Sequence, residues 1–146
     1  MLAKKLLNES IQAAISKEIA EAEQRTSGEI CIHAEDFCAG DPYKRAVQVF
    51  TELGLHRTEL RNAVLLYLAI HDRKLAIIGD QGVNEWIGAE GWVQLKEDLV
   101  QHFAKNQYEA GLVKTIHAIA DKLAAHFPPP DHSDVNELPN QISFGA

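Results

Sequence analysis

Apolar and polar residues follow one another along this chain in blocks whose lengths and spacings predict both strands and helices. Residues 63–70, AVLLYLAI, form an uncharged apolar run that is too short to cross a membrane and carries no helix cap. Such a run is typical of a strand buried on both faces, at the centre of a covered sheet. The polar residues 71–74 then reverse the chain, and residues 75–78 return as a second strand. The pattern predicts a β-hairpin, although its turn lacks an Asn-Gly or Asp-Gly pair.

The register of this hairpin determines which polar residues meet at its open end, opposite the turn. A reversal centred on Asp72 and Arg73 brings Arg61 and Asn62 opposite residues 82–84. The polar residues expected at that end are Arg61, Asn62, Asp80, Gln81, Asn84 and Glu85. This end of the sheet is the first candidate site.

Apolar residues at a spacing near 3.6 predict helices on both sides of the hairpin. An alternating stretch, residues 29–34, predicts one more strand before it. Asp41 and Pro42 form a strong helix start, because Asp is a favoured N-cap and Pro is favoured at the first helical position. Asn106 with Glu109 resembles a capping box for the last helix. Helices are predicted over residues 7–25, 41–54, 92–103 and 106–126.

The order of these elements predicts the architecture. A strand, a helix and a strand in sequence imply a right-handed crossover, which makes residues 29–34 parallel to residues 63–70. The returning hairpin strand is antiparallel to its neighbour, so the sheet is mixed. Helices around a short mixed sheet predict an α/β fold, a three-layer α/β/α sandwich with helices on both faces.

The length of 146 residues predicts one domain with a substantial core. Pro128, Pro129 and Pro130 end the last helix, and the polar sequence after them predicts an irregular tail. We therefore predict a single domain over residues 1–127 and a polar C-terminal tail over residues 128–146.

Charge and composition exclude several classes of protein. The chain has 14 Lys and Arg against 21 Asp and Glu, a net charge of −7, which argues against a nucleic-acid surface. No signal peptide and no membrane span are found in the sequence. Cys31 and Cys38 are predicted to be reduced thiols. We expect a cytoplasmic monomer.

The open end of the hairpin offers oxygen ligands for a hard cation. Asp80 and Glu85 supply carboxylates, Asn62 supplies an amide oxygen, and Glu29 begins the parallel strand and approaches the same end. Ca²⁺ and Mg²⁺ take such ligands, so these four residues are the predicted metal site. In the alternative, Asp80 and Glu85 cap the turn and the following helix, and Glu29 pairs with Arg61.

A second acidic cluster follows the carboxyl ends of the two parallel strands, where open α/β sheets usually bind ligands. Its members are Glu35, Asp36, Asp41 and Asp72. Asp41 already has a helix-capping role and Asp72 a turn role, so this cluster ranks second.

The sequence lacks the common catalytic and nucleotide-binding motifs. It has no G-x-G-x-x-G, no phosphate loop, no H-E-x-x-H and no G-x-S-x-G. His33, beside Cys31 in the first strand, is best explained as a core or interface histidine.

Several segments nevertheless resemble one known family. They are RNAVLLYLAIHDRKLAIIGDQGVNEWIG, the W-x-x-L-K run after it, NQYEAGL, DVNELP and TSGEICIHAED. Together they resemble the TPM domain, and in particular its stand-alone cytoplasmic bacterial branch, related to thylakoid-lumen proteins of photosystem II repair. The resemblance implies a Rossmann-like fold, divalent cation binding in some members and acid-phosphatase activity in plant members. The family's Gly-aromatic-Gly-Leu-Glu turn is Asp80-Gln81-Gly82-Val83-Asn84 here. Asn84 thus stands in place of the Glu and Asp80 in place of the first Gly, so the turn keeps one carboxylate but at a different position.

Three functional hypotheses follow. The first is a divalent-cation-binding module for Ca²⁺ or Mg²⁺ that acts through a protein partner. The alternative is a metal-assisted acid phosphatase, a phosphomonoesterase, for which no nucleophile is identified. A third interpretation is a partner-binding domain without an ion.

Overall fold

A mixed sheet of four strands forms the middle of the molecule in the computed structural model, which describes residues 1–129 and 141–145. The strand order is β3-β2-β1-β4. β1 is parallel to β2 and to β4, whereas β3 is antiparallel to β2. The predicted mixed sheet is therefore confirmed. The strands are β1 (Glu29–Glu35), β2 (Ala63–Ala69), β3 (Lys74–Gly79) and β4 (Ile142–Phe144).

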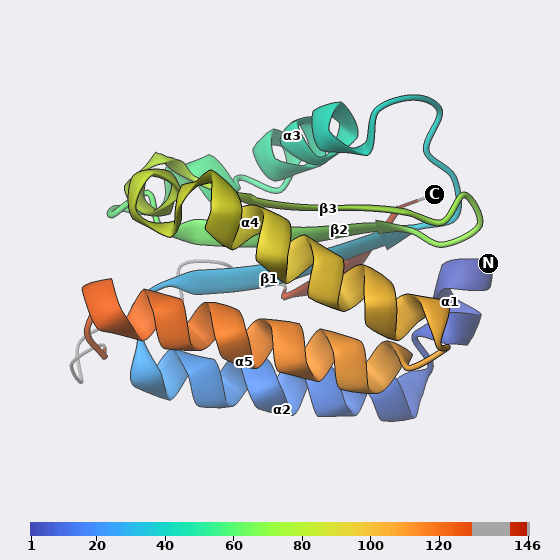
Figure 1. Ribbon diagram of the computed structural model, residues 1–146, viewed down its shortest axis with the longest axis horizontal. Coiled ribbons are helices and arrows are strands. Elements are labelled where there is room, and N and C mark those ends of the chain that lie inside the picture. Colours follow the sequence, from blue (N-terminus) through green and yellow to red (C-terminus); the bar gives the residue numbers. More distant parts are fainter. Residues whose placement is uncertain (130–140, 146) are drawn as a thin grey trace.

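Helices cover both faces of this sheet, as the three-layer prediction required. Figure 1 shows α3 on one face and α2, α4 and α5 on the other. The helices are α1 (Leu2–Leu6), α2 (Glu9–Arg25), α3 (Pro42–Glu52), α4 (Gln81–Ala104) and α5 (Tyr108–His126), with a short 3-10 helix, η1 (Leu55–Arg57). No helix within residues 1–129 and 141–145 is long and apolar enough to cross a membrane.

The uncharged run of β2 is explained by burial on both faces. Every residue of β1 and β2 is buried. Val64 and Leu66 belong to the core beneath α2, α4 and α5, while Leu65 and Tyr67 belong to the smaller core beneath α3. A strand with helices above and below it has no face left for charged side chains.

The hairpin turns one residue earlier than predicted. Val64 pairs with Gly79, and the Gly82 N–H donates to the Arg61 carbonyl at 2.8 Å. Arg61 therefore lies opposite Gly82 rather than Asn84. Arg73, in the turn, has a φ of 53°, so the turn uses a left-handed residue that is not glycine.

Two helix predictions are corrected at their boundaries. α4 begins at Gln81, much earlier than the predicted residue 92, and is interrupted at Gly88, whose φ is 72°. The capping box at Asn106 is absent: Asn106 has a left-handed φ of 58°, and Gln107, the residue before α5, makes no side-chain cap. The tight link between α4 and α5 requires a left-handed residue at Asn106. Asn106 therefore does not act as a helix cap for α5.

The prediction of an irregular tail is wrong at its end. Ile142–Phe144 form β4, which adds to the edge of β1. The Ile32 N–H donates to the Gln141 carbonyl at 2.7 Å, and the Gly145 N–H donates to the Ala34 carbonyl at 2.9 Å. β4 is therefore stabilised by backbone hydrogen bonds to the free edge of β1. The polar sequence around it gives no indication of this pairing. Residues 130–140, which include the DVNELP segment, lie outside the described residues.

Candidate functional site

Polar residues gather at both ends of the sheet. The first candidate site lies at the open end of the hairpin, where β1 and β2 begin and β3 ends. Glu29 pairs with Ala63, and the Asp80 N–H donates to the Ala63 carbonyl at 2.9 Å. The Glu29 N–H points to the Asn62 carbonyl at 3.4 Å. The structure thus brings three of the four predicted ligands, Glu29, Asn62 and Asp80, to the same end of adjacent strands. The fourth, Glu85, is exposed on α4.

Asp80 has two roles at this end. It is the N-cap of α4, and its Oδ1 accepts the Gln81 N–H at 2.8 Å. Arg61 donates to both carboxylate oxygens, from Nε at 2.6 Å and from the terminal nitrogen at 2.8 Å. The capping part of the alternative is confirmed for Asp80. Arg61, which that alternative paired with Glu29, forms its ion pair with Asp80.

The two members of this ion pair differ in exposure. The Asp80 side chain is 7% exposed, whereas the Arg61 side chain is 40% exposed. The hydrogen bond to Asp80 raises the pKa of the Arg61 guanidinium, so Arg61 stays charged. Since its guanidinium reaches solvent, Arg61 can leave Asp80 without being buried elsewhere.

Asn62 is the unusual residue of the open end. It is 1% exposed, and neither Oδ1 nor Nδ2 of its amide has a hydrogen-bond partner in the described residues. Its backbone N–H does have one, the Thr58 Oγ1 at 3.2 Å. A buried polar group without a partner is costly, so such groups mark places where a water or a ligand completes the site.

Carboxylates alone do not make a metal site here. Within residues 1–129 and 141–145, no three His, Cys, Asp or Glu side chains are grouped so that they could hold a metal ion. A cation at the open end would therefore need amide and carbonyl oxygens beside its carboxylates, which Ca²⁺ accepts.

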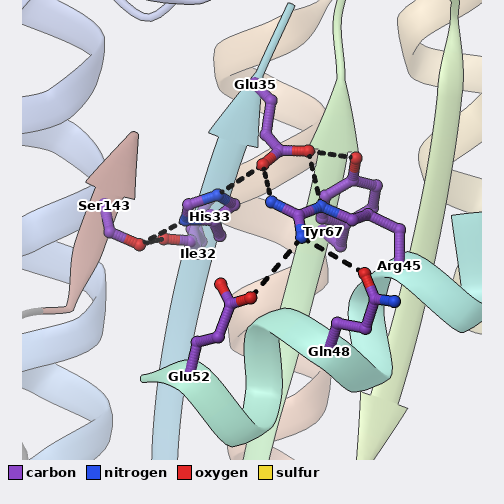
Figure 2. A network of polar contacts seen from close by, with 8 residues as sticks. All are labelled: Ile32, His33, Glu35, Arg45, Gln48, Glu52, Tyr67 and Ser143. Atoms are coloured by element: carbon purple, nitrogen blue, oxygen red, sulfur yellow. Dashed lines mark hydrogen bonds and ion pairs between the residues drawn. The ribbon is translucent and has the colours of Figure 1, made fainter. Parts of the chain in front are cut away.

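At the opposite end of the sheet, Glu35 is the centre of a polar network (Figure 2). Glu35 is 4% exposed and accepts three kinds of donor. Arg45 of α3 donates from Nε at 3.1 Å and from its terminal nitrogen at 2.6 Å, and the Tyr67 hydroxyl donates at 2.6 Å. The Nε2 of His33 lies 3.2 Å from Glu35 Oε1. Three elements, β1, β2 and α3, are joined by one carboxylate.

The pKa values of this network reflect these contacts. Burial alone would raise the pKa of Glu35, but hydrogen bonds from Arg45, Tyr67 and His33 lower it to about 2. The hydrogen bond to Glu35 raises the pKa of Arg45. Burial, with the hydrogen bond to Glu35, raises the pKa of the Tyr67 hydroxyl. The carboxylate is therefore ionised, and its two strongest donors keep their protons, at every pH at which proteins are normally handled.

The network continues through His33 to the C-terminal strand. His33 Nδ1 lies 2.7 Å from the Ser143 Oγ (Figure 2). When the His33 ring is neutral and donates from Nε2 to the ionised Glu35, its Nδ1 presents a lone pair to the Ser143 hydroxyl. The same hydroxyl also lies 3.5 Å from the Ile32 carbonyl, which is its other acceptor. The row Ser143–His33–Glu35 thus has the polarity in which a histidine can accept a hydroxyl proton.

Sequence analysis missed this row. The two-residue spacing of His33 and Glu35 on one strand does place both side chains on one face, which was the available signal. Ser143 comes from the segment that was predicted to be irregular. Nothing in the local sequence indicates that it returns to β1.

The other members of the second acidic cluster each bind backbone N–H groups. Asp36 accepts from Leu2 and Ala3 at 3.2 and 2.8 Å, and so holds the start of α1. Asp41 caps α3 by accepting the Tyr43 N–H at 2.9 Å, as predicted. Asp72 accepts the Cys38 N–H at 2.7 Å, and this bond lowers its pKa. These carboxylates hold loops and helix ends.

Comparison with known proteins identifies the fold and the family. The family model of the TPM domain matches residues 3–122. The NMR structure of BA42 from the psychrophilic bacterium Bizionia argentinensis is 36% identical, covers 94% of each chain and superposes with a TM-score of 0.85. A comparison with curated proteins finds no match.

Two more distant bacterial structures share the fold. The N-terminal domain of a P. gingivalis protein is 15% identical, with a TM-score of 0.72 over 87% of this chain and 83% of that one. The N-terminal domain of cg2496 from Corynebacterium glutamicum is 13% identical, with a TM-score of 0.64 over 88% of this chain and 83% of that one. The family model covers most of the chain, and the similarity to BA42 extends over nearly all of it, so the protein belongs to the TPM domain family.

Proposed function

We propose that this protein is a divalent-cation-binding module that acts through a protein partner. The ion, Ca²⁺ or Mg²⁺, binds at the open end of the hairpin. The observation that carries the proposal is the buried amide of Asn62, whose oxygen has no partner in the described residues. Asp80 supplies a carboxylate at the same end of the sheet, and Glu29 is the further carboxylate at the same strand ends. These are the oxygen types that hard cations bind.

Arg61 and the ion compete for Asp80 in this account. In the ion-free protein, the guanidinium neutralises the carboxylate. A cation that binds Asp80 must displace it, which the 40% exposure of the Arg61 side chain permits. Because this exchange opposes binding, we expect an ion affinity in the millimolar rather than the nanomolar range.

Ion binding at this place would stabilise two elements at once. Asp80 begins α4 and Asn62 precedes β2, so an ion between them ties the helix start to the strand. A surface that is fixed by ion occupancy is suited to a partner that binds only the occupied form.

Thermal unfolding in excess EDTA and in millimolar Ca²⁺ or Mg²⁺ tests the proposal. Ion saturation should raise Tm, because a ligand that binds only the folded state adds to its stability, by about 2.7 kcal/mol when its concentration is a hundred times Kd. The Asp80→Asn variant should lose the increase. Asp98→Asn, which removes an exposed carboxylate from the same helix, is the matched control. Identical melting curves with and without ions would refute the proposal.

A second candidate function is phosphomonoesterase activity, and the row Ser143–His33–Glu35 favours it. The Ser143 Oγ would attack the phosphorus while its proton passes to His33 Nδ1, and the ester P–O bond would break as His33 gives that proton to the leaving oxygen. A water would then attack the phosphorus, give its proton to His33 and form inorganic phosphate, while the bond from the phosphorus to Ser143 breaks and the serine oxygen takes the proton back. Turnover of p-nitrophenyl phosphate that persists through purification and disappears in Ser143→Ala would support this activity. Turnover that is unchanged in Ser143→Ala would exclude the row as its source.

A further inference from the structure

We propose that a cavity at the turn end of the hairpin binds a small amphipathic anion, with an apolar body and a carboxylate head. The cavity has a volume of about 620 Å³. Four segments form it: α1, the β2–β3 turn, the last turns of α4 and the link to α5. They lie together at one end of the molecule in Figure 1. This end is opposite the proposed cation site, so the inference is independent of that proposal.

The walls of the cavity are largely apolar. They include Leu2 and Leu6 from α1, Leu75 from β3, and Val100 and Phe103 from α4. Leu2 remains 42% exposed and Val100 44% exposed, although both are large apolar side chains. An apolar ligand body would remove this surface from water, which is favourable in proportion to the area covered.

The charged residues of the cavity are Arg73, in the hairpin turn, and Lys74, the first residue of β3. His71 of the turn also lines it, and no Asp or Glu is among its described lining residues. The chain as a whole carries a net charge of −7, so a cavity lined by basic but not acidic residues is a local departure from the overall charge. The lining is therefore complementary to a single negative charge.

Arg73 is the residue best placed to hold that charge. Its side chain is exposed, and it makes no hydrogen bond or ion pair with the described residues. Lys74, by contrast, already donates to the carbonyls of Cys38 and Gly40 at 2.9 and 2.8 Å. A guanidinium offers a planar pair of donors that matches a carboxylate.

The acidic residues nearest to the turn are engaged elsewhere. Asp36 binds the first N–H groups of α1, and Asp72 binds the Cys38 N–H and His71. The Asp36 oxygens are held by backbone donors, and those of Asp72 by the Cys38 N–H and the His71 ring; neither carboxylate is paired with Arg73. The volume of about 620 Å³ lies within the range of small-molecule sites.

An amide NMR titration with decanoate below its micelle concentration tests the inference. We expect saturable shifts confined to residues 2–6, 69–75 and 100–108, which line the cavity. Acetate, which has the head alone, should give no saturable shifts, and 1-decanol, which has the body alone, should bind more weakly. Arg73→Asn removes the charge while keeping a residue that tolerates the left-handed φ of 53°. It should weaken decanoate binding about tenfold and leave decanol binding unchanged.

A pair of valines on α4 gives a matched control. Val100→Glu places a carboxylate in the cavity wall and should abolish decanoate binding. Val93→Glu makes the same change at a 54% exposed position two turns earlier and outside this cavity, so binding should persist. The inference is overturned if decanoate gives no saturable shifts, if Arg73→Asn binds it as tightly as the wild type does, or if Val93→Glu abolishes binding and Val100→Glu does not.

Discussion

At the scale of single residues, each end of the sheet has a buried carboxylate that forms an ion pair with an arginine. Asp80 pairs with Arg61 at the open end, and Glu35 pairs with Arg45 at the other. The surroundings of the two pairs differ. Glu35 also accepts from Tyr67 and lies beside His33, so several elements depend on it. Among side chains of the described residues, Asp80 is bound by the exposed Arg61 alone. We interpret Glu35–Arg45 as a structural pair and Asp80–Arg61 as an exchangeable one.

The Glu35 pair predicts how stability depends on pH. The pKa of Glu35 is lowered from 4.5 to about 2 in the folded state, so the unfolded chain binds the proton more tightly. The resulting stability is present above pH 4.5 and is lost as pH falls toward 2. It amounts to about 3 kcal/mol. Denaturant unfolding should show a rise over this window in the wild type that is clearly smaller in Glu35→Gln, where only other carboxylates with a lowered pKa, such as Asp72, remain.

The control for this prediction is Glu52→Gln. Glu52 is the other acidic partner of Arg45, at 3.7 Å, but its side chain is 65% exposed. Exposed ion pairs contribute little, so this variant should retain the wild-type pH dependence. The same pH dependence in Glu35→Gln as in the wild type would show that Glu35 is not the titrating group.

The Asp80 pair predicts that removal of its arginine improves ion binding. Arg61 has a left-handed φ of 50°, so Arg61→Asn is the substitution that keeps the backbone. With the competing cation gone, Asp80 is free for Ca²⁺, and the apparent Kd should fall several-fold. Isothermal calorimetry measures it. An unchanged or weaker affinity in Arg61→Asn would mean that the ion does not use Asp80.

At the scale of elements, α4 is held at its start by a close approach of two backbones. A Cβ at Gly82 would lie 2.3 Å from the Leu60 carbonyl oxygen and 2.5 Å from that of Arg61. Gly88, at the break in the same helix, has no atom within 4 Å of its Cβ position, but its φ is 72°. Gly82 is required because there is no room for a side chain, whereas Gly88 is favoured only by its left-handed backbone conformation.

This difference predicts unequal costs for two identical substitutions. Gly82→Ala must move backbone that belongs to the open end, and we expect a loss of about 3 kcal/mol. Gly88→Ala meets no atoms and should lose about 1 kcal/mol through its left-handed backbone alone. Unfolding free energies from urea titrations compare the two. Equal losses would contradict the close packing at Gly82.

The same scale shows which elements a sequence can predict. α3 was predicted because Asp41 and Pro42 signal a helix start locally, and β2 because a buried strand needs an uninterrupted apolar run. The predicted start of α4 was too late, because Gly88 separates the first turns of the helix from the periodic apolar residues on which the prediction was based. β4 was missed because a strand of three residues exists only through its pairing with β1.

At the scale of the whole molecule, the topology of the sheet explains why part of the candidate site could be predicted. Parallel β1 and β2 and antiparallel β3 place Glu29, Asn62 and Asp80 at one end, and strand order alone predicts that. The partner of Arg61 and the burial of the Asn62 amide depend on packing and were not predictable. The cavity beside Arg73 is formed by three stretches that are far apart in sequence, residues 2–6, 69–75 and 100–108, so no local pattern reveals it.

The proposed arrangement divides the molecule into two functional ends, with a cation at the open end and an anion at the turn end. The two can be tested separately, because the sheet lies between them and the residues named for each do not overlap.

An amide NMR titration of the wild-type protein with Ca²⁺, and then Mg²⁺, tests the central claim most directly. The account predicts saturable shifts at millimolar ion that are confined to residues 29, 61–63 and 79–85. Shifts centred instead on Glu35, Asp36 and Asp72 would move the site to the other end of the sheet. No shifts at millimolar ion would contradict cation binding altogether.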